Sequence, residues 1–185
     1  MNRNSFQWFR SVLTAVLFVP CLTMPACAGT VARPGEAFAN FTDDGGWCWF
    51  SDPRAVTRDG KTYSGWVNED GSVQAGMLDH RSGRITTVNL HSQYERDDHD
   101  APSFLFLPDG QLMAFYSKHG GPDMNARVTM RPGDFNDWQL ERILDISAIP
   151  RPRKTITYSN PVLLSKETNA IYLFWRGDTW KPTFS

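Results

Sequence analysis

Cysteine is scarce in this chain, and the shortage excludes one common way of stabilising a small exported domain. Of its three cysteines, Cys21 and Cys27 lie in an N-terminal segment that has the features of an export leader, which leaves only Cys48 for the remainder. A single cysteine cannot form an internal disulfide framework, so the fold must depend on its hydrophobic core. We predict that Cys48, between two tryptophans, is a small buried residue without a reactive role.

An excess of charge of one sign is also missing. The chain has 19 Lys and Arg against 20 Asp and Glu, and a formal net charge of −1. Loss of residues 1–28 would remove Arg3 and Arg10 and no acid, which moves the net charge to −3. This balance argues against nucleic acid as a partner, since a phosphate-binding surface needs excess Lys and Arg. A local basic pocket for an acidic sugar remains compatible with it.

No apolar run is long enough to cross a bilayer. The longest, residues 12–22, falls short of the roughly 20 residues that a membrane span requires. It follows a positive segment with Arg3 and Arg10 and precedes small residues suited to cleavage. We therefore predict a signal peptide at 1–28 and a secreted or periplasmic protein without a membrane span. A lipid anchor at Cys27 and a retained leader are the less favoured alternatives.

Helical periodicity is almost absent after the leader, and a repeated β pattern takes its place. Short runs of Val, Ile, Tyr, Phe and Trp alternate with Gly, Asp, Asn and Pro, as in all-β proteins. Three units align, starting near residues 47, 98 and 157, each with a proline-led strand, a hairpin turn and an aromatic-ended second strand. The prolines are Pro53, Pro102 and Pro161, the turns are at 59–60, 109–110 and 168–169, and the second strands are at 61–66, 111–116 and 170–175. Further strands are predicted at 72–78, 85–90, 126–130 and 138–144.

The repeat favours a β-propeller of four-stranded antiparallel blades over a β-sandwich, because a sandwich has no reason to repeat a whole unit. A propeller closes with about 4–8 blades. Residues 29–185 would supply about three of them. We therefore expect a partial propeller domain and interpret the chain as the N-terminal part of a larger protein. A frameshifted gene and an oligomer that completes the ring are the alternatives.

His99 is the first candidate for chemistry. A histidine titrates near neutral pH and serves as a general acid or base. Asp97, Asp98 and Asp100 surround it in sequence and could hold its tautomer. A solvated acidic turn and a calcium site built from the aspartates are the alternatives, although the spacing of a calcium loop is missing.

Three further candidates occupy related positions in the units. His119 ends the second strand of the second unit, beside two glycines that allow a ligand to approach closely. Tyr158 precedes the third unit as His99 precedes the second, so both could face one pocket. Arg176 ends the third unit's second strand and could grip a carboxylate in bidentate fashion. Each also has an ordinary interpretation, as a turn histidine, a packing tyrosine or a surface ion pair with Asp178.

Several short motifs occur in an order that resembles the BNR-repeat propeller family that includes the ulvan lyases. The resemblance spans residues 47–185. The motifs are Ser-Asp-Pro-Arg at 51–54, Asp-Asp-His-Asp-Ala-Pro at 97–102, Phe-Tyr-Ser-Lys-His-Gly at 115–120, Tyr-Ser-Asn-Pro at 158–161 and Phe-Trp-Arg-Gly at 174–177. Repeats of the neuraminidase type, Ser-x-Asp-x-Gly-x-Thr-Trp, are degenerate at best.

The resemblance implies a seven-bladed propeller that cleaves an acidic, ulvan-like polysaccharide by β-elimination. His99 and Tyr158 then match the pair that removes the proton at uronate C5 and protonates the leaving oxygen. Arg176 matches the residue that neutralises the carboxylate, His119 matches a supporting histidine, and Asn160 is assigned to substrate binding. No cofactor and no metal ligand are predicted for this site.

Two other functions stay open. A sialidase-like glycoside hydrolase would need paired carboxylates, or a tyrosine nucleophile with its base, and an arginine cluster. Arg54 and Arg176 do not make a convincing cluster. A non-catalytic carbohydrate-binding propeller would instead use Trp66, Trp175 and Trp180 as stacking platforms.

Overall fold

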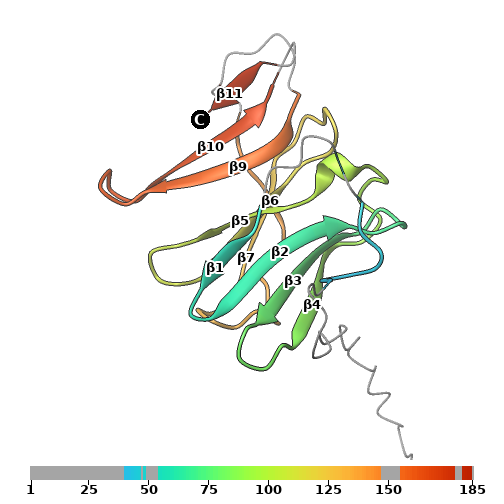
Figure 1. Ribbon diagram of the computed structural model, residues 1–185. Helices are drawn as coiled ribbons and strands as arrows, with labels where there is room; N and C mark the ends of the chain where they lie inside the picture. The colour runs from blue at the N-terminus through green and yellow to red at the C-terminus, as the bar shows by residue number, and fades with distance from the viewer. Residues whose placement is uncertain (1–39, 47, 49–53, 147–154, 178–180, 185) are drawn as a thin grey trace, which may run out of the picture.

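The structure, a computed structural model, describes residues 40–46, 48, 54–146, 155–177 and 181–184. Within them the chain is all-β, with one short 3-10 turn, η1 (Asp98–Asp100). The strands form three antiparallel sheets that follow one another along the chain (Figure 1). In the described part, no helix has the length and hydropathy needed to span a membrane. The predicted leader lies outside these residues.

Each sheet is built from strands that are consecutive in sequence. The first has the order β1-β2-β3-β4, the second β5-β6-β7-β8, and the third β11-β10-β9. The bounds are β1 (Val56–Arg58), β2 (Lys61–Val67), β3 (Val73–Asp79), β4 (Ile85–His91), β5 (Ser103–Phe106), β6 (Leu112–Tyr116), β7 (Asn125–Val128), β8 (Arg142–Ile143), β9 (Thr157–Leu164), β10 (Ala170–Arg176) and β11 (Pro182–Phe184). A meander of this kind, repeated sheet after sheet, is the pattern of propeller blades.

The hairpin turns form where the sequence predicts them. Asp59 and Gly60 connect β1 to β2 with φ values of 51° and 69°. Two successive positive φ angles characterise a two-residue hairpin whose twist matches the strands on either side. Thr168 and Asn169, with φ values of 53° and 59°, end the longer loop 165–169 between β9 and β10, because Leu164 pairs with Ala170. The local turn chemistry therefore defines where each second strand begins.

The predicted strand at 138–144 is much shorter than expected. Within this range only residues 142–143, which form β8, pair with β7 as a strand. Further along, Thr129 and Trp138 form a single isolated bridge. The Arg127 side chain explains the difference, because its Nε donates to the Gln139 carbonyl at 2.9 Å and its NH2 to the Trp138 carbonyl at 3.4 Å. A guanidinium thus satisfies carbonyls that a strand neighbour would otherwise bond.

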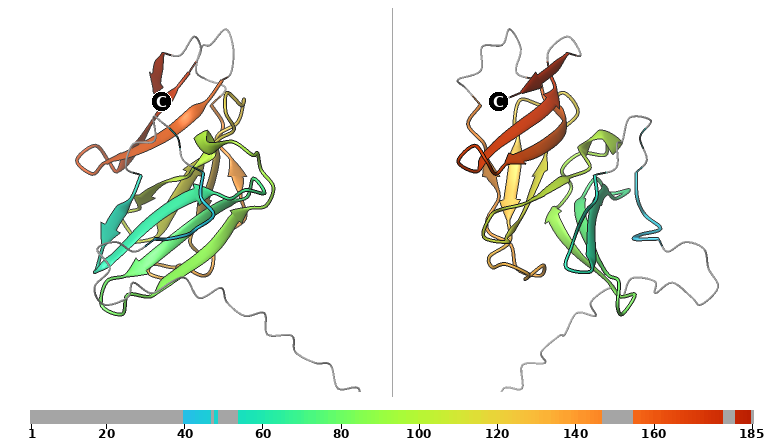
Figure 2. Two further views of the ribbon diagram at one scale, coloured as in Figure 1. Left: turned by 45° about the vertical axis from the view of Figure 1, so that its right-hand side comes forward. Right: turned by 60° about the vertical axis from the view of Figure 1, so that its left-hand side comes forward.

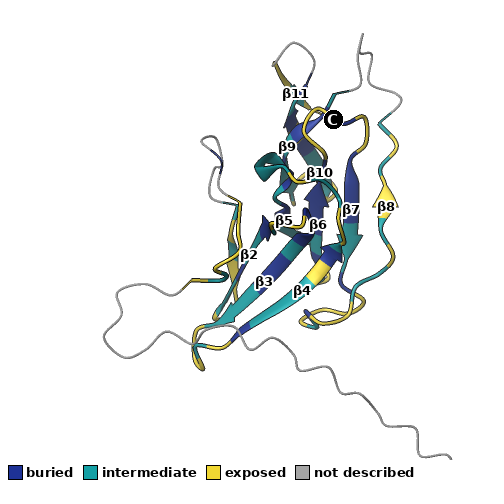
Figure 3. Cartoon of the chain, turned by 90° about the vertical axis from the view of Figure 1, so that its right-hand side faces the viewer, coloured by how far each residue is buried: buried dark blue, intermediate teal, exposed yellow. Residues whose placement is uncertain are grey.

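The middle sheet is buried on both faces. Along β6, Leu112, Ala114 and Tyr116 pack into a core shared with the first sheet, whereas Phe115 packs into a core shared with the third. This alternation follows from the two-residue period of a strand. Figure 2 shows the sheets side by side, and Figure 3 shows that β6 is mostly buried and β8 exposed. The first core also holds Tyr63, Val73, Ala75, Leu90, Phe104 and Phe135, and the second Met124, Ala126, Ile156, Leu173 and Trp175.

One glycine allows the first two sheets to approach closely. A Cβ atom at Gly65 in β2 would overlap the ring of Pro102 and lie 2.7 Å from the Gln74 carbonyl oxygen. Only a residue without a side chain fits there. Pro102, which directly precedes β5, therefore packs against the face of β2.

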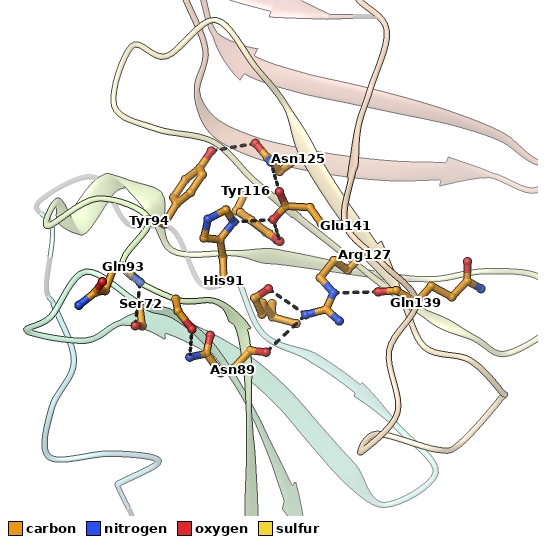
Figure 4. Close-up of polar contacts among 12 residues, drawn as sticks. Ser72, Asn89, His91, Gln93, Tyr94, Tyr116, Asn125, Arg127, Gln139 and Glu141 are labelled. Carbon is orange, nitrogen blue, oxygen red and sulfur yellow. Dashed lines mark hydrogen bonds and ion pairs between the residues drawn. The ribbon is translucent and has the colours of Figure 1, made fainter.

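A partly buried polar network connects the first and second sheets (Figure 4). Glu141 accepts hydrogen bonds from the Tyr116 hydroxyl, from His91 Nδ1 at 2.6 Å and from Asn125 Nδ2 at 2.7 Å. Tyr94 donates to Asn125 Oδ1 at 2.8 Å. Burial alone would raise the pKa of Glu141, but the three hydrogen bonds together lower it. A charged carboxylate thus holds His91, at the end of β4, against the second sheet.

Candidate functional site

The site begins at η1, the turn between the first and second sheets. Asp97 caps this turn, since its side chain accepts a hydrogen bond from the His99 backbone amide at 2.9 Å. The same carboxylate oxygen lies 2.6 Å from His99 Nδ1, and Asp98 Oδ1 lies 2.7 Å from it. The acidic residues therefore orient the His99 ring, and Asp97 also caps the first turn of η1.

A second histidine stacks on the first. The rings of His99 and His119 lie 3.9 Å apart, with an angle of 9° between their planes. Asp97 uses its other oxygen to contact His119 Nδ1 at 3.0 Å. With both Nδ1 atoms facing one carboxylate, each neutral ring carries its proton on Nδ1, and Nε2 holds the lone pair. The tautomer is thus assigned by the hydrogen-bond network.

The loop after β6 carries His119 to this place. The His119 amide donates to Glu95 at 2.9 Å, and the Gly120 amide donates to Thr157 Oγ1 at 2.8 Å. Gly120 has a φ of 67°, which favours glycine. The loop is thereby fixed between η1 and the start of β9.

Tyr158 projects from a β-bulge. Phe174 pairs with Asn160 and Arg176 with Thr157, so three steps along β9 oppose two along β10. Tyr158 takes up the extra residue with a φ of 60°. Bulges of this kind re-aim a side chain beside a functional site. Here the ring stacks on His99 at 5.0 Å.

Two arginines flank the tyrosine. The guanidinium carbon of Arg176, at the end of β10, lies 4.8 Å from the centre of the Tyr158 ring, and that of Arg54 lies 5.2 Å from it. Arg54 also donates to the Ala101 carbonyl at 2.6 Å. Burial raises the pKa of Tyr158, a hydrogen bond with Cys48 raises it further, and the charge of Arg176 lowers it. The net direction is upward, so the phenol keeps its proton at neutral pH.

Cys48 is buried, as predicted, with 3% of its surface exposed. Its sulfur also contacts polar groups of two other residues. Sγ lies 3.0 Å from the Tyr158 hydroxyl and 3.7 Å from His99 Nε2. The thiol therefore contacts two of the predicted site residues.

The three aspartates differ in charge state. Burial would raise the pKa of Asp97, but the hydrogen bonds from the His99 amide and from both histidine rings outweigh it and lower the pKa. Asp100 is fully buried, and neither carboxyl oxygen has a hydrogen-bond partner among the described residues. Burial raises the pKa of Asp100 to about 9, with a further contribution from the charge of Glu95. Asp100 is thus a neutral acid at pH 7.

We expect Asp100→Asn to stabilise the fold increasingly as pH rises. The folded protein keeps a proton on Asp100 up to about pH 9, whereas an unfolded aspartate releases it near pH 4. Between these pH values, each unit by which the pH rises lowers the unfolding free energy of the wild type by at most about 1.4 kcal/mol. Asparagine has the same shape and no proton to lose.

Urea unfolding of both proteins at pH 5, 7 and 8.5 measures the difference in unfolding free energy. The exposed Asp137→Asn is the matched control, and a pH-independent difference for Asp100→Asn would contradict this prediction.

Two groups of side chains have the composition of metal ligands. They are Cys48, Asp98 and His99, and Asp97, His99 and His119, and within each group the ligand atoms lie within 4.8 Å of one another. Two atoms that share a tetrahedral zinc at about 2.0 Å each lie roughly 3.3 Å apart. The 2.6 Å between Asp97 and His99 is therefore the distance of a direct hydrogen bond.

An acidic cleft of about 400 Å³ opens beside Asp97 and Asp98. Asp43, Asp44 and Glu69 contribute to its lining, together with Arg96. Arg54 and Arg176 lie instead at the Tyr158 ring. An anionic group on a ligand is therefore expected at the tyrosine rather than in this cleft.

Four of the sequence candidates, His99, His119, Tyr158 and Arg176, meet at one place. The fifth, Asn160, lies two residues after Tyr158 in β9 and donates to the Tyr158 carbonyl at 3.2 Å. The sequence does not place Cys48 at this site, because Cys48 lies far from its partners along the chain. Arg54 is considered from the sequence only as a member of an unconvincing arginine cluster, whereas it lies with Arg176 at the Tyr158 ring.

The tryptophan prediction needs correction. Trp66 is 8% and Trp175 is 3% exposed, so neither can serve as a stacking platform for a sugar. Trp66 packs against Phe41 and Gly76 on the face of the first sheet opposite Gly65, and Trp175 packs into the core between the second and third sheets. Trp180, Pro53 and Asp178 lie outside the described residues.

The chain is similar to solved structures of ulvan lyases, reported as a new family of polysaccharide lyase. One is bound to a saccharide of glucuronic acid linked 1-4 to 3-sulfated rhamnose, and has 20% sequence identity and a TM-score of 0.56. The match covers 78% of this chain and 38% of that one. A second ulvan lyase structure has 20% identity and a TM-score of 0.51, with 72% and 34% covered. The chain thus spans less than half the length of these proteins.

At this identity the similarity establishes the fold, which is that of a β-propeller. No curated protein sequence matches the chain. The sequence pattern of one family does match, over residues 61–184, which is more than half of the 185 residues. On that match, the chain belongs to the BNR repeat-containing family.

Proposed function

We propose that this protein is part of a secreted polysaccharide lyase that cleaves a uronate-containing, ulvan-like polysaccharide by β-elimination. Residues 1–28 would direct export, and residues 29–185 would form the blades that carry the site. One observation carries the proposal, namely the stack of His119, His99 and Tyr158 beside Arg176. An imidazole, a phenol and a fixed cation are the three groups that this elimination needs.

His99 is the proposed base. Asp97 holds its Nδ1, so Nε2 has the lone pair that can accept the proton from C5 of the uronate. The imidazolium formed in this step is stabilised by the same carboxylate. His119, bound to the other oxygen of Asp97, supports the orientation of that group.

Tyr158 is the proposed acid. Since burial raises the pKa of its phenol, the hydroxyl carries a proton that it can give to the departing glycosidic oxygen. Tyr158 and His99 stack on each other, and both contact the same sulfur. The acid and the base therefore act from one side of the sugar ring.

Arg176 is the proposed partner of the uronate carboxylate. The C5 proton is weakly acidic until the charge of the carboxylate is offset, because negative charge develops there in the transition state. Arg176 lies at the Tyr158 ring, and Arg54 adds a second cation close by. Asn160 is proposed to assist in substrate binding from the adjacent part of β9.

The proposal is tested by the product. The purified protein is incubated with a glucuronate-containing polysaccharide, and the ultraviolet absorbance of the conjugated unsaturated uronate is followed beside the release of reducing ends. Elimination raises both signals, whereas hydrolysis raises only the second. The same polysaccharide with its carboxyl groups reduced to alcohols is the control and should remain intact. Release of reducing ends without the ultraviolet signal would contradict the proposal and favour a glycoside hydrolase.

A further inference from the structure

The Cys48 thiol lies between the two groups to which the proposed function assigns proton transfer. Its sulfur is 3.0 Å from the Tyr158 hydroxyl and 3.7 Å from His99 Nε2. Only 3% of the Cys48 surface is exposed. A thiol is a weak donor and a weak acceptor at once, so it can hydrogen-bond to both neighbours.

Each turnover leaves these two neighbours in the wrong protonation states. After elimination His99 holds an extra proton and Tyr158 lacks one. Asp97 already engages the Nδ1 proton, so the extra proton is on Nε2, which is the nitrogen that faces the sulfur. Before the next turnover one proton must move from His99 to Tyr158.

We propose that Cys48 relays this proton, an inference that rests on the proposed function. The S–H bond of Cys48 breaks as its proton passes to the Tyr158 phenolate oxygen. The sulfur takes the proton of His99 Nε2 in exchange. The step restores a phenol, a thiol and a neutral imidazole, with no net change in charge and no oxidant or reductant.

The ordinary acidities of the three groups support this direction. An imidazolium is a stronger acid than a thiol, and a thiol is a stronger acid than a phenol. Each transfer therefore moves the proton to a more basic atom. The phenolate is also disfavoured by burial, and direct exchange with bulk water is restricted around a sulfur that is nearly fully buried. The weak hydrogen bonds of sulfur do not trap the proton on the way.

The relay is tested with Cys48→Ala and Cys48→Ser on the same substrate. With enzyme in excess, a single turnover needs no reset, so Cys48→Ala should form product at a rate within about twofold of wild type, because the phenol and the imidazole that carry the chemistry are both still present. With substrate in excess, it should show a burst of one product per site and then a steady rate at least about tenfold lower, because the proton transfer has become limiting. Cys48→Ser, whose hydroxyl can also relay, should recover most of the steady rate.

A second measurement separates the relay from a packing role. Added imidazole buffer should accelerate the slow steady phase of Cys48→Ala and leave wild type unchanged, since a diffusing proton carrier can replace the thiol. A steady rate equal to wild type, or an equal fall in both phases without rescue by serine or imidazole, would overturn the relay alone. If the unaltered protein forms no unsaturated product, the proposed function fails and the relay fails with it.

Discussion

Tyr158→Phe is expected to lower kcat by about 10²–10⁴-fold, the usual contribution of a positioned general acid. Phenylalanine keeps the ring on His99 and the arginines beside it, so KM should change little. The lost hydroxyl also loses its contact with Cys48, at a cost to stability of about 0.5–1.5 kcal/mol. The rate of unsaturated product formation measures the first effect, and thermal unfolding measures the second.

Tyr172→Phe is the matched control, because Tyr172 lies in the same sheet and its hydroxyl contacts Glu167 at 3.2 Å, away from the site. That variant should keep wild-type activity. If Tyr158→Phe also keeps more than roughly a tenth of the activity, the phenol is not the acid, since a general acid contributes more than this. An unfolded Tyr158→Phe protein would instead indicate a purely structural tyrosine.

Asp97→Asn is expected to lower kcat by a similar amount, of the order of 10²–10⁴-fold, as when the carboxylate that orients a catalytic histidine is replaced by an amide. One carboxylate accepts from the Nδ1 atoms of both His99 and His119. An asparagine has one oxygen to accept with, and its amide group would face the other ring as a donor. At least one histidine must then turn or change its tautomer.

The matched control is Asp109→Asn. Asp109 accepts from the backbone amide two residues on, Gln111, at 3.0 Å, just as Asp97 accepts from His99. The control therefore carries the same change at a turn cap without a histidine beside it. Proton NMR of the imidazole Nδ1–H signals reports the tautomer directly. Unchanged signals together with unchanged kcat in Asp97→Asn would rule out the orienting role.

Features determined by local chemistry could be predicted from the sequence. The Asp59-Gly60 turn needs positive φ angles, which few residue types provide, and the two strands that it connects could be predicted from it. The equivalence of His99 and Tyr158 came from the repeat, because corresponding positions in successive sheets lie at the same end. Together with the family resemblance, this located four of the side chains that meet.

Features that depend on long-range contacts could not be predicted. Cys48 contacts Tyr158 across 110 positions of the chain, and nothing near Cys48 signals that contact. The bulge in β9 is visible only when the register with β10 is known. The shortness of β8 depends on Arg127 reaching the carbonyls of Trp138 and Gln139. Asp100, in the same acidic run as Asp97, is a neutral buried acid, because burial rather than sequence decides its charge.

The backbone conformation at Tyr158 lowers the stability of the fold at a residue that the proposed activity needs. A φ of 60° costs a tyrosine about 1 kcal/mol or more, and costs a glycine almost nothing. Glycine at this position would relieve the backbone and remove the proposed acid together. A directed-evolution campaign that rewarded heat resistance alone would not protect the tyrosine, so each round of such a campaign needs an activity screen.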